Sequence, residues 1–104
     1  MVLDFELKRR EVEIEGRRFK IRELTLGEVS TILNRSMSMA IDDSGRILPT
    51  FNYLEYRLSI LEFCLEEPKF DRRNGEKLPS RIAFALLEEC IKLTPQLSSL
   101  RQNI

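Results

Sequence analysis

The chain contains no histidine and no tryptophan, and it has only two cysteines and four glycines. Without histidine it lacks the usual general base near neutral pH, and it cannot form the serine–histidine or cysteine–histidine pairs of nucleophilic catalysis. The commonest nitrogen ligand for metals is missing too, and two cysteines cannot build a four-thiolate zinc site. No glycine-rich phosphate loop is present. We therefore predict no catalytic, cofactor-binding or metal-binding residues, and a protein that is not an enzyme.

Net charge and long apolar runs are also absent. Seventeen Lys and Arg residues balance seventeen Asp and Glu residues, whereas bulk nucleic-acid binding needs a net basic surface. No apolar run approaches the roughly 20 residues of a membrane-spanning helix, and the charged first ten residues do not resemble a signal peptide. These patterns predict a cytoplasmic protein with no nucleic-acid or membrane partner. Cys64 and Cys90 lie in apolar helical patterns, which favours reduced core residues and leaves a disulfide as the open alternative.

What is present indicates one globular domain over residues 1–104, because 42% of the residues are hydrophobic and 33% are charged. Residues 10–23 alternate with period two, which is typical of a half-buried β-hairpin. A turn at Gly16-Arg17 would place Ile14 opposite Phe19 and Val12 opposite Ile21 on the core side. On the solvent side it would pair each glutamate with a basic residue. We predict this turn and this register.

The rest of the chain is predicted to be mainly helical. Thr25 to Glu28 has the spacing of a capping box, which starts a helix, and loops are expected at 41–51 and 69–77 because both contain clusters of turn residues. Three main helices and a short last helix are predicted, over residues 26–40, 53–66, 80–93 and 95–102. The predicted fold is α+β and predominantly α-helical, with the N-terminal two-stranded hairpin packed on these helices.

The second helix carries two apolar stripes on nearly opposite sides. One stripe holds Leu54, Leu58, Leu61 and Leu65 and is expected to be core. The other is expected to be less buried, because aromatic residues with a polar group suit interfaces. With one residue of the third helix it gives the predicted partner-binding set: Tyr53, Tyr56, Ile60, Phe63 and Phe84. The alternative is that this helix is central and is covered on both sides by its own chain.

Two charged features could suggest other chemistry. Glu66, Glu67 and Asp71 could form a carboxylate group, but nothing in the sequence makes them converge, and a solvated helix end is the simpler interpretation. Three short basic clusters, 8–10, 17–18 and 72–73, have acidic neighbours. We interpret them as solvated surface.

The order of several motifs resembles a known family. After the hairpin comes Leu24-Thr25-Leu26-Gly27-Glu28, a later helix closes with Glu67-Pro68, and Leu78-Pro79 opens the next helix. Over residues 11 to 93 this order is similar to that of the tail assembly chaperones of long-tailed phages and related prophage elements. The individual motifs are degenerate, so the resemblance depends on their order.

The resemblance implies a non-enzymatic protein that self-associates and holds a long helical client, such as a tape-measure protein, until the tail tube assembles. The end of the chain suits the short form of that family. The alternative is a structural or regulatory subunit of an unrelated cytoplasmic protein complex. In either case we expect a protein partner or client, and a homo-oligomer.

Overall fold

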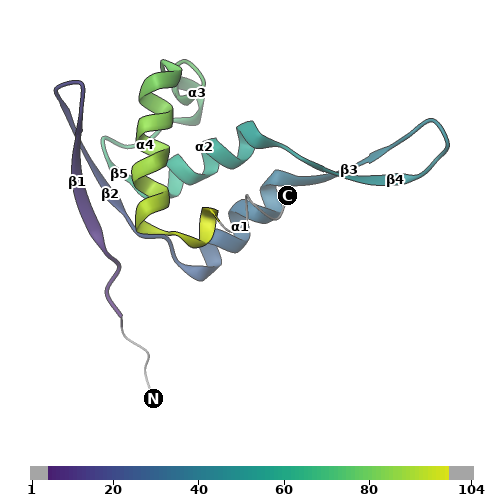
Figure 1. Ribbon diagram of the computed structural model, residues 1–104, viewed down its shortest axis with the longest axis horizontal. Helices are drawn as coiled ribbons and strands as arrows, with labels where there is room; N and C mark the ends of the chain where they lie inside the picture. Colours follow the sequence, from purple (N-terminus) through teal and green to yellow (C-terminus); the bar gives the residue numbers. More distant parts are fainter. Residues whose placement is uncertain (1–4, 99–104) are drawn as a thin grey trace.

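The computed structural model describes residues 5–98 of the 104-residue chain and has an α+β fold (Figure 1). A three-stranded antiparallel sheet has the strand order β1-β2-β5, and β3 and β4 form a separate two-stranded sheet. Helix α4 packs against the larger sheet, α2 packs against α4 and leads into β5, and α1 packs against α2. In chain order the elements are β1 (Arg9–Ile14), β2 (Arg17–Arg22), α1 (Leu26–Ser36), β3 (Met37–Ile41), β4 (Ile47–Phe51), α2 (Tyr53–Cys64), β5 (Leu65–Glu67), α3 (Arg72–Gly75) and α4 (Ser80–Leu93).

The N-terminal hairpin forms where predicted, but the predicted register is wrong. Ile14 lies opposite Arg17 and Val12 lies opposite Phe19, so the turn is Glu15-Gly16 and not Gly16-Arg17. Both turn residues have positive φ, 50° and 82°. That conformation defines the type I′ turn, whose twist matches the right-handed twist of the strands. Turn geometry therefore outweighed the apolar cross-strand pairs on which the prediction relied.

The faces of the hairpin are nevertheless as predicted. The observed pairing differs from the predicted one by two residues, and a shift of two leaves every side chain on the same face. Phe19 and Ile21 are buried, and Val12 and Ile14 pack against the same core. The exposed face keeps its opposite charges in register, for example Glu13 opposite Arg18.

Helix α1 begins as predicted and ends earlier. The Thr25 hydroxyl accepts from the backbone N–H of Glu28, and the Glu28 carboxylate accepts from the N–H of Thr25, which confirms the capping box. The helix ends at Ser36, not at residue 40, and the residues that follow form β3. The prediction of a loop over residues 41–51 is also wrong, because Ile47–Phe51 forms β4 and pairs with β3. The sequence contained a signal for this hairpin, since both segments hold β-branched or apolar residues around the turn-forming stretch that ends at Gly45.

Helix α2 ends at Cys64 rather than at residue 66, and the next three residues add a third strand to the N-terminal sheet. Leu65 pairs with Ile21, and Glu67 pairs with Lys20. Proline at position 68 disfavours helical backbone for the residue before it, which helps to end the helix early. β2 is therefore the central strand of its sheet, and α2 leads directly into the edge strand β5.

Helix α2 is the central helix of the core. Tyr56 and Ile60 are buried, so the prediction that they belong to a less buried stripe is wrong. The Tyr56 hydroxyl donates to the Leu97 carbonyl oxygen at 2.7 Å, so this polar group is satisfied inside the chain. Of the leucine stripe, Leu58, Leu61 and Leu65 are buried as predicted, whereas Leu54 is 50% exposed.

The C-terminal part matches the sequence prediction more closely. Helix α4 spans the predicted residues 80–93. The polar segment before it includes the short helix α3, which Asp71 caps by accepting from the Arg73 N–H. A last helical turn covers residues 96–98, with Leu97 buried. The remainder of the helix predicted over 95–102 lies outside the described residues.

Candidate protein-binding groove between α2 and α4

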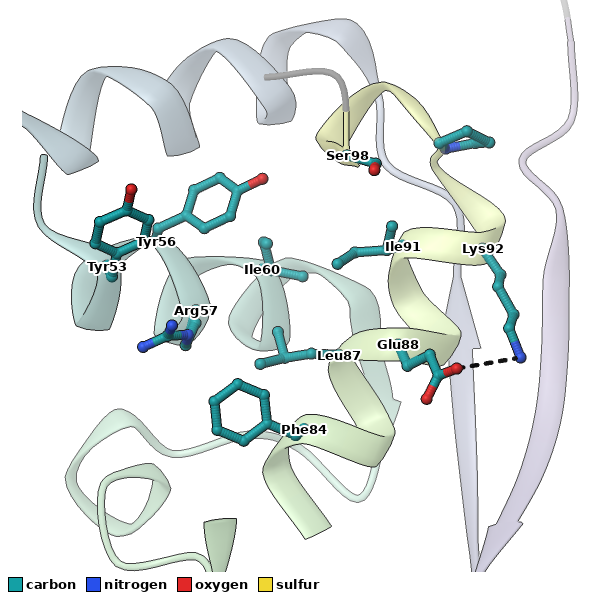
Figure 2. Close-up of a pocket in the computed structure, with 11 residues that line it drawn as sticks. Tyr53, Tyr56, Arg57, Ile60, Phe84, Leu87, Glu88, Ile91, Lys92 and Ser98 are labelled. Carbon is teal, nitrogen blue, oxygen red and sulfur yellow. Dashed lines mark ion pairs between the residues drawn. The ribbon is translucent and has the colours of Figure 1, made fainter. Parts of the chain in front are cut away.

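A groove of about 510 Å³ lies between α2, α4 and the segment that follows α4 (Figure 2). Tyr56 and Ile60 of α2 point toward Leu87 and Ile91 of α4 across the groove, whereas Glu88 and Lys92 point away from α2. The α2 side is formed by Tyr53, Tyr56, Arg57 and Ile60. The α4 side and the far end are formed by Phe84, Leu87, Glu88, Ile91, Lys92, Pro95 and Ser98.

The groove has a buried apolar floor and an exposed aromatic rim. Tyr56, Ile60 and Leu87 are buried and close the floor. Tyr53 and Phe84 form the rim, and Phe84 is 52% exposed. Large exposed apolar side chains around a concave site are typical of surfaces that bind a partner.

A basic side chain, Arg57, lies against both aromatic rings of the rim. The Arg57 guanidinium lies 5.1 Å from the centre of the Phe84 ring and 5.6 Å from that of Tyr53, both within cation–π range. Lys92 also lines the groove, and it forms ion pairs with Glu89 at 3.2 Å and with Glu88 at 4.0 Å. The groove thus has an apolar floor and one basic side chain, Arg57, over its aromatic rim.

Four of the five predicted partner-binding residues meet in this groove: Tyr53, Tyr56, Ile60 and Phe84. Two of them, Tyr56 and Ile60, belong to its floor and not to an exposed stripe. Phe63 does not line the groove. Its ring is half-buried and lies 5.2 Å from the Arg35 guanidinium of α1.

Sequence reasoning missed the contribution of Arg57, Leu87 and Ile91. Phe84, Leu87 and Ile91 have the spacing i, i+3, i+7, so they share one face of α4. That signal was present in the sequence. Which face of α4 meets α2 is decided only when the helices pack, so the spacing alone could not identify the groove.

The carboxylates considered from the sequence do not converge. Glu66 pairs with Arg9 at 3.1 Å, Glu67 pairs with Lys20 at 3.5 Å, and Asp71 caps α3. Among residues 5–98, no group of three or more acidic or cysteine side chains is placed to hold a metal ion.

The basic clusters have acidic neighbours in space. Arg10 pairs with Glu89 at 3.1 Å, and Arg18 lies 3.7 Å from Glu11. Arg72 binds Glu62 at 2.8 Å and also pairs with Glu55, which fastens the segment before α4 to α2.

Cys64 and Cys90 are free thiols, and both are buried. The hydrogen bond with Cys64 and burial raise the pKa of the Cys90 thiol above its ordinary value. A thiol with a raised pKa stays protonated and is a poor nucleophile. Both side chains belong to the buried core cluster.

Within the described part of the chain, no helix is long and apolar enough to cross a membrane. Comparison of the chain with protein-family models, with curated proteins and with solved structures finds no match in any of the three.

Proposed function

We propose that this protein binds other protein chains without catalysis, as a tail-assembly-type chaperone that self-associates and holds a long helical client such as a tape-measure protein. The observation that supports client binding is the groove between α2 and α4. Its rim residue Phe84 is 52% exposed, although a folded chain gains by burying such a ring. The motif order described above motivates the choice of client.

The shape of the groove favours a helical client. Its walls come from two helices, and its apolar floor lies between them. An amphipathic helix can lay residues i, i+3, i+4 and i+7 into such a groove and leave its polar side in solvent. Binding of this kind depends on apolar packing and needs no reactive group.

The charges at the rim favour a particular type of helix. Arg57 stands over the aromatic rim, whereas Lys92 is paired with Glu88 and Glu89 on its own helix. Acidic residues flanking the apolar stripe of a client would meet Arg57. Such rim charges contribute mainly to association rate and specificity.

The direct test uses the long helical protein encoded by the gene immediately downstream, where the proposal expects a tape-measure gene. Its helical segment, produced as a peptide, is titrated against the full chain by isothermal calorimetry. Truncating an anchor side chain costs about 1–3 kcal/mol of binding free energy, so Phe84→Ala should weaken binding by roughly 5- to 150-fold.

Leu54→Ala is the matched control. Leu54 is 50% exposed, close to the value for Phe84, but it lies outside the groove. This variant should bind like the parent protein. Equal loss in both variants, or no binding by the parent protein, contradicts the groove as the client site. A partner that copurifies stoichiometrically and is not the downstream product would instead favour the subunit alternative.

A further inference from the structure

The β3–β4 hairpin has one face that is entirely apolar. Residues opposite each other in an antiparallel pair share a face, and the register pairs Met37 with Phe51, Met39 with Pro49, and Ile41 with Ile47. The other face carries Ser38, Ala40, Leu48 and Thr50. Met39 is 71% exposed and Ile41 is 74% exposed, and Ile47 is also exposed. These apolar side chains are therefore left largely uncovered by the part of the chain that the structure describes.

The hairpin also stands apart from the core. β3 and β4 pair only with each other among the described strands, and they extend away from the helices (Figure 1). A two-stranded hairpin alone is marginally stable in water and is usually stabilised by burying its apolar face. Only the base of this face reaches the core, where Phe51 contacts Tyr56 with the ring centres 5.3 Å apart. The elements within residues 5–98 leave the outer two-thirds of the face exposed.

The charges around the hairpin favour a second copy of this chain as the cover of this face. The apolar face carries no ionisable side chain, so two copies can meet face to face without repulsion or an unpaired buried charge. The tip carries Asp42 and Asp43, and Arg46 is paired with Asp42 at 3.1 Å. An acidic tip disfavours approach to an anionic lipid surface or to nucleic acid.

We propose that the apolar face of the β3–β4 hairpin packs against the same face of a second copy, in a two-fold symmetric dimer. Such a contact uses the same patch on both partners, as two-fold dimers do. Because the hairpin extends from the core, two copies can pack hairpin against hairpin while their helices remain apart.

The size of the face predicts a reversible dimer. Two strands of five residues present a surface of roughly 17 by 10 Å, from a rise of about 3.4 Å per residue and a strand spacing of about 4.8 Å. That is smaller than the roughly 800 Å² per partner of a standard stable interface. The dimer should therefore dissociate on dilution.

This inference deepens the self-association in the proposed function and names its surface. Phe51 begins the apolar face, and its ring lies 4.8 Å from Tyr53 at the rim of the groove. A dimer formed through the outer part of the hairpin therefore holds two client grooves in one particle. Two linked grooves bind a long client with higher avidity than either does alone.

The test compares two neighbouring substitutions that add the same charge to opposite faces. Met39→Glu places a carboxylate in the proposed interface, and Ala40→Glu places one on the other face; both positions are exposed, so neither change should disturb the core. Sedimentation velocity from about 1 µM to about 1 mM should show a monomer–dimer equilibrium for the parent protein. Met39→Glu should raise the dimer dissociation constant by at least about tenfold, and Ala40→Glu should leave it within about twofold.

The other outcomes separate the possible failures. If the parent protein dimerises and both variants do too, the hairpin face is not the interface, although self-association stands. A parent protein that remains monomeric at about 1 mM overturns both this interface and the self-association part of the proposed function. Binding of the client peptide to Met39→Glu is measured separately, so client binding can succeed or fail independently. Cosedimentation with neutral phosphatidylcholine vesicles, abolished by Met39→Glu and without any dimer, would assign the face to lipid and overturn the proposal.

Discussion

The link between Arg22 and Glu28 gives a sharp test of how the N-terminal sheet is joined to α1. Arg22 ends β2 and donates from Nη1 to Oε1 of Glu28 at 2.8 Å and from Nη2 to Oε2 at 2.5 Å. The same carboxylate accepts from the Thr25 N–H and completes the helix cap. Glu28→Gln removes the charge and turns an amide N–H₂ group toward a guanidinium that has only donors.

The expected loss is about 2–3 kcal/mol of unfolding free energy at pH 7. A hydrogen bond to a charged group contributes about 1.5–3 kcal/mol, and loss of a helix cap costs about 1 kcal/mol. Both side chains are largely shielded, with 19% of Arg22 and 20% of Glu28 exposed, so solvent screening is modest. The amide oxygen of Gln keeps part of the cap, so the two contributions do not add in full. In a domain of this size the loss corresponds to roughly 8–20 °C in Tm.

The loss should depend on pH with a definite sign. The hydrogen bonds from Arg22 lower the pKa of the Glu28 carboxyl below its ordinary value, against the opposing effect of burial. A group with a lowered pKa in the folded state stabilises the protein fully above its unfolded pKa, about 4.3 for Glu. That contribution disappears as the pH falls through the folded pKa. The difference in unfolding free energy between the parent protein and Glu28→Gln should therefore be largest near neutral pH. It should shrink toward zero in acid.

Urea denaturation followed by circular dichroism, at several pH values between about 7 and 3, measures this difference. Glu11→Gln is the control, because the Glu11 carboxylate is exposed and lies 3.7 Å from Arg18. Exposed ion pairs contribute about 0–1 kcal/mol, so this variant should change stability little. A Glu28→Gln loss that is below about 0.5 kcal/mol, or that stays constant with pH, refutes the reasoning.

Two further substitutions test the packing. Leu61→Ala should cost about 2–5 kcal/mol of unfolding free energy, because this side chain is 2% exposed and its removal leaves a cavity. Leu54→Ala should cost less than about 1 kcal/mol. Equal losses in urea denaturation would mean that α2 is oriented differently. Gly75→Ala should destabilise the fold by about 1–3 kcal/mol, because an added Cβ would lie 2.1 Å from Cζ of the Phe70 ring. The additional change Phe70→Ala removes that ring, so the cost of Gly75→Ala should shrink in a Phe70→Ala background, and an undiminished cost would contradict the clash.

The faces and caps of this protein could be predicted because they depend on neighbours in sequence. Alternation alone places Phe19 and Ile21 on the buried face of the N-terminal hairpin, whichever even shift the register takes. The spacing of Thr25 and Glu28 specifies the capping box, because its hydrogen bonds join residues three apart. Helix α4 was predicted within its observed bounds for the same reason.

The candidate groove could be predicted only in part. The apolar and aromatic residues of α2 and α4 identified four of its lining residues, including Tyr53 and Phe84. The sequence could not show that Tyr56 would lie in the floor of the groove and Tyr53 at its rim. The buried hydroxyl of Tyr56 donates to the carbonyl oxygen of Leu97, which is 41 residues away in the chain. Nor could it place Phe63 against Arg35, since that contact depends on how α1 crosses α2.

Only the tertiary structure decided where α2 ends. Its helical pattern continues through residues 65–66, yet these residues form a strand, because they pair with β2 from the start of the chain. The helical pattern of α1 also continues through residues 37–40, but there the strand β3 pairs with β4 across a turn-forming stretch that is visible in the sequence. Ladder hydrogen bonds to a partner replace the intrahelical ones only when the chain has brought that partner alongside. The hairpin register was likewise set by the positive φ angles of Glu15 and Gly16, whose turn matches the twist of the strands it joins.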